Sequence, residues 1–228
     1  ESVTSAVTNV IDPFKPATKA ELQTAVNLWI SDKATALSTY GEINTWNVSL
    51  ITDMSELFKD KTTFNDDIGN WDVSNVTNMG SMFEGATNFN GDVSNWDVSK
   101  VNYTPSMFRS ATNFNQDISG WVFSPAWNGM HSMFFGATNF NQNLSAWDVS
   151  NVDNMYAAFQ DADSFNQDLS SWDVSSANTM WNMFAGTDSF NGDISSWDVS
   201  NLVHFREMFH GAESFNQDLS SWDVSSVT

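Results

Sequence analysis

Residues 71–95 read WDVSNVTNMGSMFEGATNFNGDVSN, and this 25-residue pattern recurs along most of the chain. Tryptophan marks each recurrence, every 25 residues or in one case 26, at positions 46, 71, 96, 121, 147, 172, 197 and 222. With each Trp counted as position 1, the consensus is W-D-V-S-x-V-x-x-M-x-x-M-F-x-G-A-x-x-F-N-x-D-[ILV]-S-x. Repetition at a fixed period of this length is typical of arrays in which every unit packs on its neighbours. The sequence therefore predicts a repeat fold.

The repeat occupies residues 46–228 of the 228-residue chain. Seven full units begin at 46, 71, 96, 121, 147, 172 and 197, and a partial eighth begins at 222. The extra residue lies in the fourth unit near Ser124-Pro125-Ala126, and we place it in a connection between elements. Because the chain does not start with Met and stops within a unit, we expect a processed chain or part of a longer one.

Residues 1–45 lie outside the repeat and carry helical signals. Thr18 and Glu21 have the spacing of a capping box, and apolar residues follow them up to Gly41. We interpret this segment as an N-terminal helical cap that covers the apolar face of the first unit.

Two periodicities inside the unit predict its secondary structure. Apolar residues around Trp-Asp-Val have the spacing of a leucine-rich-repeat strand, so we expect a short parallel strand there. Val76, Met79, Met82, Phe83 and Ala86 recur at intervals of three or four, which is typical of one helix face. With a Ser at position 4 as N-cap and a Gly at position 15 as stop, a helix of two to three turns is expected. The predicted fold class is thus an α/β repeat solenoid of leucine-rich-repeat type.

Phenylalanine and asparagine recur at fixed positions of the unit. Phe stands at positions 13 and 19 of every full unit, which predicts stacked columns in the core. Position 20 is Asn in every full unit. Since an amide can both donate and accept, we expect a buried Asn ladder that joins neighbouring units.

These motifs resemble those of BspA-like leucine-rich-repeat surface proteins. The resemblance rests on stretches such as WDVSNVTNM at 71–79, TNFNQNLS at 138–145 and FKPATKAELQTAVNLWISDK at 14–33. It implies a surface or secreted repeat protein, often involved in adhesion, with no shared enzymatic activity and no single common ligand.

The composition limits the possible partners. The chain has 28 acidic and 8 basic residues and a formal net charge of −20. A nucleic-acid-binding protein needs a basic face, so that class is disfavoured, as is binding to an anionic membrane surface. Hydrophobic residues make up 41% of the chain, so a core can form; no apolar run is long enough to span a membrane. Cysteine is absent, which excludes disulfides and thiolate chemistry.

Two acidic columns are the first candidate sites. Position 2 lies between Trp and Val, and we expect it to point outward from the strand. Its acidic members, here named the Asp column, are Asp72, Asp97, Asp148, Asp173, Asp198 and Asp223. The column could bind Ca²⁺ or a polyhydroxylated ligand; alternatively, duplication copied a solubilising Asp whose repulsion is absorbed by counterions or a raised pKa. At position 22, Asp or Asn is expected to form an Asx-type turn.

Variation between units points to a second candidate. Position 10, expected on the outward side of the helix, differs in every unit. Tyr156 and Trp181 occupy it in adjacent units, near His131 and Phe135, and could form an aromatic contact patch. Alternatively, they are singly exposed aromatic residues.

Glycosylation and catalysis have weaker signals. Sequons occur at Asn47, Asn75, Asn102 and Asn143 and would matter in a eukaryotic secretory pathway. No nucleophile elbow, phosphate loop or zinc-protease motif is present, so no catalytic residue is predicted.

We expect a non-catalytic module at a cell surface or outside the cell, with no required cofactor, that binds protein or glycan for adhesion or recognition. The alternative is a structural subunit that packs into a larger multi-protein assembly. A polysaccharide-active enzyme is a distant third.

Overall fold

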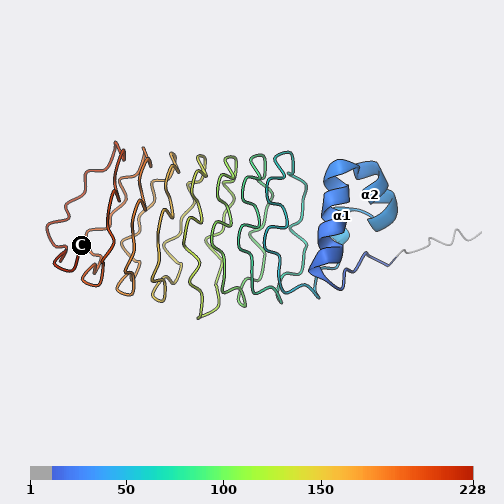
Figure 1. Cartoon of the computed structure of the whole chain (residues 1–228), viewed down its shortest axis with the longest axis horizontal. Helices are drawn as coiled ribbons and strands as arrows, with labels where there is room; N and C mark the ends of the chain where they lie inside the picture. Colours follow the sequence, from blue (N-terminus) through green and yellow to red (C-terminus); the bar gives the residue numbers. More distant parts are fainter. Residues whose placement is uncertain (1–11, 228) are drawn as a thin grey trace, which may run out of the picture.

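The repeat units follow one another as stacked coils along the long axis of the molecule (Figure 1). This computed structural model describes residues 12–227; residues 1–11 of the predicted N-terminal segment and Thr228 lie outside the described residues. Three helical elements precede the coils: helix α1 (Lys19–Ser31), helix α2 (Lys33–Tyr40) and the 3-10 turn η1 (Ile43–Thr45). Among the described residues, no helix is both long and apolar enough to cross a bilayer.

Local caps define the two helices. The Thr18 side chain accepts a hydrogen bond from the Glu21 backbone N–H at 3.2 Å and starts α1. Asp32 ends α1 and caps α2, accepting from the Thr35 N–H at 3.1 Å. Gly41, with φ 73°, follows the last residue of α2. The predicted helical start and stop are confirmed, but Asp32 divides the segment into two helices.

Helix α1 lies against the first repeat unit. The rings of Trp29 and Trp46 meet edge to face at 5.8 Å, and the Trp29 indole N–H donates to Asp66 at 2.8 Å. The Gln23 amide donates to the Leu57 carbonyl at 3.0 Å. These contacts cover the apolar side of the first coil, where Trp46 is 2% exposed.

The prediction of an α/β solenoid of leucine-rich-repeat type is wrong. In the described residues the only α-helices are α1 and α2, both before the repeat, and no strand forms a sheet. Isolated parallel bridges occur at position 8 instead, joining Asp53 to Asn78, Asn78 to Tyr103, Asn154 to Thr179, and Thr179 to His204. The units are therefore stacked turns rather than strand-plus-helix pairs.

The segment predicted as a helix, residues 76–86, folds as consecutive turns. Ser81 and Gly85 have φ values of 54° and 68°, outside the helical region. Alternate N–H groups bond within the unit, as from Met82 to the Met79 carbonyl at 3.1 Å. The others cross to the next unit, as from Phe83 to the Met107 carbonyl at 2.9 Å. Because half of the donors bond between units, this backbone holds neighbouring coils together.

The segment predicted as a strand, Trp-Asp-Val, forms a corner. The Trp71 N–H bonds back to the Ile68 carbonyl at 3.1 Å, and the Val76 N–H to the Val73 carbonyl at 2.8 Å. The Ser74 hydroxyl, expected to cap a helix, donates to Asp72 at 2.6 Å instead. These i to i−3 bonds bend the chain at each Trp, so no extended strand can form here.

Aromatic columns form the core, as predicted. Phe83 stacks on Phe108 of the next unit at 5.6 Å and on Phe89 of its own unit at 3.9 Å. Trp96 and Trp121 stack at 6.4 Å, and the Trp96 indole N–H donates to a buried backbone carbonyl. The Phe side chains at positions 13 and 19 are fully buried from Phe58 to Phe190 and partly buried at Phe209 and Phe215.

The Asn residues at position 20 form a ladder, but on the surface. The Asn65 side-chain oxygen accepts from the Asn90 N–H at 2.8 Å, and Asn90 accepts from Asn115 in the same way at 2.9 Å. The pattern continues through Asn141, Asn166, Asn191 and Asn216. Most of these residues are exposed, so the predicted burial is wrong, because position 20 follows the buried Phe at an outer corner.

Candidate binding surfaces

The Asp column lies on exposed corners, and each carboxylate is bonded within its own turn. Asp72 accepts from the Ser74 N–H at 3.1 Å and from its hydroxyl at 2.6 Å. The same N–H bond recurs at Asp97, Asp148, Asp173, Asp198 and Asp223, with distances of 3.0 to 3.1 Å. The column therefore has a structural role, because it supplies the turn with its acceptor.

The pKa values of the Asp column are lowered, whereas from the sequence alone a raised pKa was considered as a way to absorb the repulsion between carboxylates. Hydrogen bonds from Ser74 lower the pKa of Asp72, although the neighbouring Asp97 opposes this shift. The pKa of every other member is lowered in the same way by the Ser two residues further on. A raised pKa does not absorb the repulsion, and these carboxylates are ionised at neutral pH.

The structure gives no support for a preformed calcium site. In residues 12–227, no group of three or more His, Cys, Asp or Glu side chains lies close enough to hold a metal ion. A single-file column presents one carboxylate per unit, whereas Ca²⁺ takes six to eight oxygen ligands.

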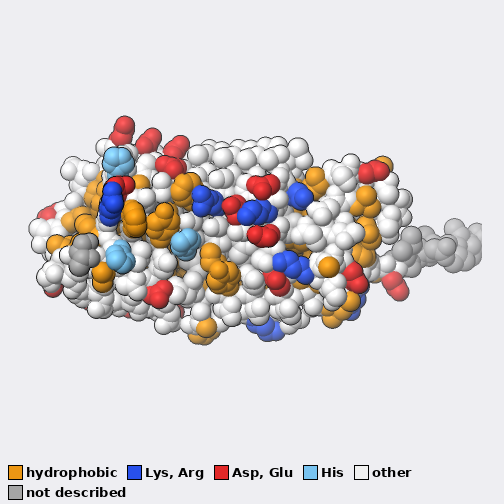
Figure 2. All heavy atoms as spheres, in the orientation of Figure 1, with side chains coloured by type: hydrophobic (Ala, Val, Ile, Leu, Met, Phe, Trp, Pro, Cys, Tyr) orange, Lys and Arg blue, Asp and Glu red, His pale blue; other side chains and the backbone are white. Residues whose placement is uncertain are grey.

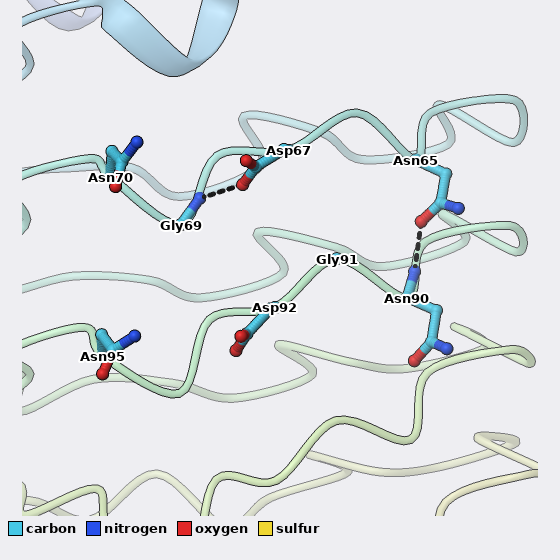
Figure 3. Close-up of a pocket in the computed structure, with 8 residues that line it drawn as sticks. All are labelled: Asn65, Asp67, Gly69, Asn70, Asn90, Gly91, Asp92 and Asn95. Carbon is cyan, nitrogen blue, oxygen red and sulfur yellow. Dashed lines mark hydrogen bonds between the residues drawn. The ribbon is translucent and has the colours of Figure 1, made fainter.

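The position-22 column forms Asx-type turns, as predicted. Asp67 accepts from the Gly69 N–H at 2.8 Å, and Asp92 accepts from the Ser94 N–H at 2.9 Å. Figure 3 shows the first of these bonds beside the Asn65–Asn90 bond, in a shallow polar pocket between two units. Its remaining lining residues are Gly69, Asn70, Gly91 and Asn95. The oxygens that bond here maintain the turns.

The position-10 side chains of four successive units contact one another. His131 stacks on Tyr156 with ring centroids 5.1 Å apart, and Tyr156 meets Trp181 edge to face at 5.9 Å. The Arg206 guanidinium lies over the Trp181 ring at 5.7 Å. We name these four residues the aromatic row. Trp181 is 38% exposed, His131 and Tyr156 are half-buried, and Arg206 is exposed.

The backbone explains why position 10 faces outward. Residues at positions 9, 12 and 13, such as Met155, Ala158 and Phe159, are fully buried. Position 11 has positive φ, as at Ala157 with 51°, so the chain turns directly after position 10. The row was predicted on a helix face; it lies instead on a stack of turns. Phe135, predicted to join it, packs under the Arg109 guanidinium at 4.4 Å.

The face that carries this row is chemically mixed. The face of the molecule that Figure 2 shows carries hydrophobic, basic, acidic and His side chains. Burial lowers the pKa of His131, against a hydrogen bond to the Asn154 side chain that raises it, so this imidazole is uncharged at neutral pH. Position 10 holds Ser55, Gly80, Pro105, His131, Tyr156, Trp181 and Arg206 in successive units. This surface changes from unit to unit while the core columns repeat.

The sequon asparagines lie on the surface. Asn75, Asn102 and Asn143 are exposed, and Asn47 is half-buried. The Asn47 and Asn143 side chains accept from the N–H groups of Ser49 and Ser145, so both serve as turn acceptors.

Sequence reasoning missed a pocket in the fourth unit. Its lining residues are Trp121, Val122, Phe123, Ser124, Pro125, Trp127, Ala146, Asp148 and Asn151, and we name it the Trp127 pocket. The signal was the stretch WVFSPAW at 121–127, which replaces W-D-V-S-x-V and contains the extra residue. It was interpreted only as an insertion in a connection.

These features define a repeat protein of stacked turns with one variable outward row. The chain belongs to the family described as "Mycoplasma protein of unknown function, DUF285", which matches residues 29–146, 126–196 and 169–228. The three overlapping matches agree with the internal repeat. No curated protein and no solved structure matches the chain.

Proposed function

We propose that this chain is a non-catalytic binding module that recognises a protein or glycan partner through the aromatic row. The observation that carries the proposal is the continuous contact from His131 through Tyr156 and Trp181 to Arg206 on an exposed face. Tyr, Trp and Arg are the residue types most enriched at interface hot spots.

The geometry supports a binding role because the row is held in place before a partner arrives. Each ring contacts the next, and the backbone below it is bonded to the neighbouring unit, as from the Ala157 N–H to the Trp181 carbonyl at 2.9 Å. Ordering of side chains on binding normally costs free energy, and a preformed row reduces that cost. Contact along several units also suits an extended partner.

The proposed location is a cell surface or the extracellular space. It rests on the resemblance of the repeat to BspA-like surface proteins. Membership of the family of unknown function does not by itself indicate a location. Nucleic acid remains an unfavourable partner, because a net charge of −20 repels phosphates.

The test is a screen of protein and glycan arrays with the wild-type chain and four variants. Tyr156→Ala, Trp181→Ala and the double variant remove the exposed rings; Leu50→Ala, which truncates a side chain 53% exposed outside the row, is the matched control. We expect an array partner whose binding weakens at least tenfold in the double variant and is unchanged in L50A. Thermal melts check that each variant is folded.

Two results would count against this proposal. Equal binding by wild type and the double variant would show that the row is not the contact surface. Absence of any array partner, together with concentration-dependent self-association in light scattering, would favour the assembly-subunit alternative.

A further inference from the structure

The fourth unit departs from the repeat where its first corner should form. Val122 replaces the Asp of position 2 and is 72% exposed, so the usual Asx-type turn has no carboxylate acceptor. The Ser124 N–H bonds instead to the Val101 carbonyl of the preceding unit at 3.1 Å. The Ser124 hydroxyl accepts from the Ala126 N–H at 3.3 Å. This corner is therefore closed by different hydrogen bonds from those of the other units.

Large aromatic rings stand at this corner: Phe123 replaces the Val of position 3, and Trp127 replaces the smaller apolar residue of position 6. Phe123 stacks on Trp127 with centroids 4.3 Å apart and planes 7° apart. Both rings meet Trp147 edge to face, at 5.1 and 5.7 Å. The Trp127 indole N–H donates to the Thr104 hydroxyl at 2.9 Å. The position-1 Trp of this unit, Trp121, keeps the repeated bond and donates to the Val93 carbonyl at 3.1 Å. Three mutually packed rings give this corner a fixed shape.

Phe123, Trp121 and Trp127 line the Trp127 pocket, which has a volume of about 210 Å³. Phe123 is partly buried, and the two Trp side chains are each 2% exposed. Sites for drug-sized molecules have roughly 300–1,000 Å³. The pocket is therefore suited to one side chain or one small group.

A carboxylate and an amide stand at its rim. Asp148 accepts from the Ser150 N–H at 3.0 Å and from its hydroxyl at 2.6 Å, which holds it in place and ionised. The Asn151 amide donates to the Pro125 carbonyl at 3.0 Å and ties the rebuilt corner to the next unit. The pocket combines an aromatic wall with a fixed negative charge, on a chain whose net charge is −20.

We propose that the Trp127 pocket binds the side chain of an arginine presented by a basic segment of a partner protein. The aliphatic stem and planar guanidinium of Arg pack on aromatic rings, and its N–H groups match a carboxylate. The overall negative charge favours approach of a basic segment. The pocket and the aromatic row share no residue, so this inference stands or falls separately from the proposed function.

Direct binding of a minimal probe tests the proposal. Nα-acetyl-arginine amide is titrated into the ¹⁵N-labelled chain, and the indole N–H signal of Trp127 is followed. We expect a saturable shift with a dissociation constant on the order of 1–10 mM, the strength of a single anchor. Nα-acetyl-citrulline amide, which has nearly the same shape without the charge, should shift that signal far less.

Two variants separate the pocket from the general acidity. Asp148→Asn keeps the turn, because Asn47 accepts from Ser49 in the same way, but it removes the rim charge. Asp173→Asn makes the same change one unit further on, where Val149 stands in place of Phe123. We expect D148N to weaken probe binding roughly threefold or more and D173N to leave it nearly unchanged.

Several results would overturn the inference. These are no saturable Trp127 shift up to about 50 mM probe, equal binding of the citrulline probe, or equal loss in D148N and D173N. Stronger binding of methyl β-glucoside than of the arginine probe would assign the pocket to a sugar instead. Loss of the pocket response in the Tyr156/Trp181 double variant would contradict the independence of the two surfaces.

Discussion

Phe134 offers the sharpest test of the stacked core. Its side chain is fully buried, and its ring lies 5.7 Å from Phe108, 5.5 Å from Phe159 and 4.1 Å from Phe140. Replacement of a buried Phe by Ala typically destabilises a protein by about 3–5 kcal/mol. Because two neighbouring units share this ring, we expect Phe134→Ala to fall in the upper part of that range.

Phe134→Leu separates the volume of the ring from its stacking. Leu keeps most of the buried apolar volume but loses four aromatic contacts, the three above and one with Trp147 at 6.1 Å, each worth about 0.5–1.5 kcal/mol beyond burial. We expect a loss of about 2 kcal/mol, between that of the Ala variant and that of the exposed control Leu50→Ala, which should stay within about 0.5 kcal/mol.

Urea unfolding followed by circular dichroism measures these differences. Coupling between units is local in a repeat array, so the Ala variant should also show a broader transition, as the halves on either side of Phe134 begin to unfold separately. A loss below about 1 kcal/mol for F134A, or equal losses for F134A and L50A, would refute the stacked-column account.

Three further predictions concern the turns and the ladder. Gly186→Ala should destabilise the protein by about 2 kcal/mol, because φ is +65° and the new Cβ would overlap Asp161 Oδ1. Gly136→Ala has a similar φ of +67°, but its new Cβ would lie 3.4 Å from the nearest atom, so the loss should be about 1 kcal/mol. Equal losses in the two variants would contradict this reasoning. Asn166→Ala should cost about 1 kcal/mol by leaving the Asn191 N–H without its acceptor, while Asn166→Asp should stay near wild type. For the Asp column, the pKa values are lowered in the folded state, so the stabilisation is complete above the unfolded pKa of about 3.9 and is lost as the pH falls through the folded values. The urea midpoint should therefore decrease as the pH is lowered from about 4 to 3. A midpoint that increases over this range would contradict the role of these bonds.

Much of the architecture could be predicted because identical units must bury the same positions. The recurring Phe residues predicted the core columns, and Thr18 and Gly41 predicted the helical boundaries before the repeat. These features follow from burial and capping, which a single sequence reports directly.

The secondary structure of the unit was mispredicted for a physical reason. Val76, Met79, Met82, Phe83 and Ala86 are all buried, at the spacing of a helix face. Consecutive turns closed by i to i−3 bonds also direct residues three or four apart to one side, so this spacing does not distinguish turns from a helix. Positive φ at positions 11 and 15 decides the outcome, and only the frequent Gly at position 15 hinted at it.

The candidate surfaces were predicted unevenly. Tyr156 and Trp181 were placed together correctly because any stack brings the same position of adjacent units side by side. The Asp column was correctly placed on the surface, but its bonds to Ser were not foreseen, since the strand hypothesis left no turn for it to cap. The Trp127 pocket was missed because the consensus of the other units does not predict the conformation of an irregular unit.

The central claim is that each unit consists of turns whose position 10 faces outward. Backbone chemical shifts and HN–Hα couplings of the labelled chain test it most directly. Within residues 12–227, we predict helical shifts confined to Lys19–Ser31 and Lys33–Tyr40, and couplings of left-handed residues at Ser81, Ser106 and Asn182. Helical shifts across residues 76–86 and their counterparts in the other units would contradict the account.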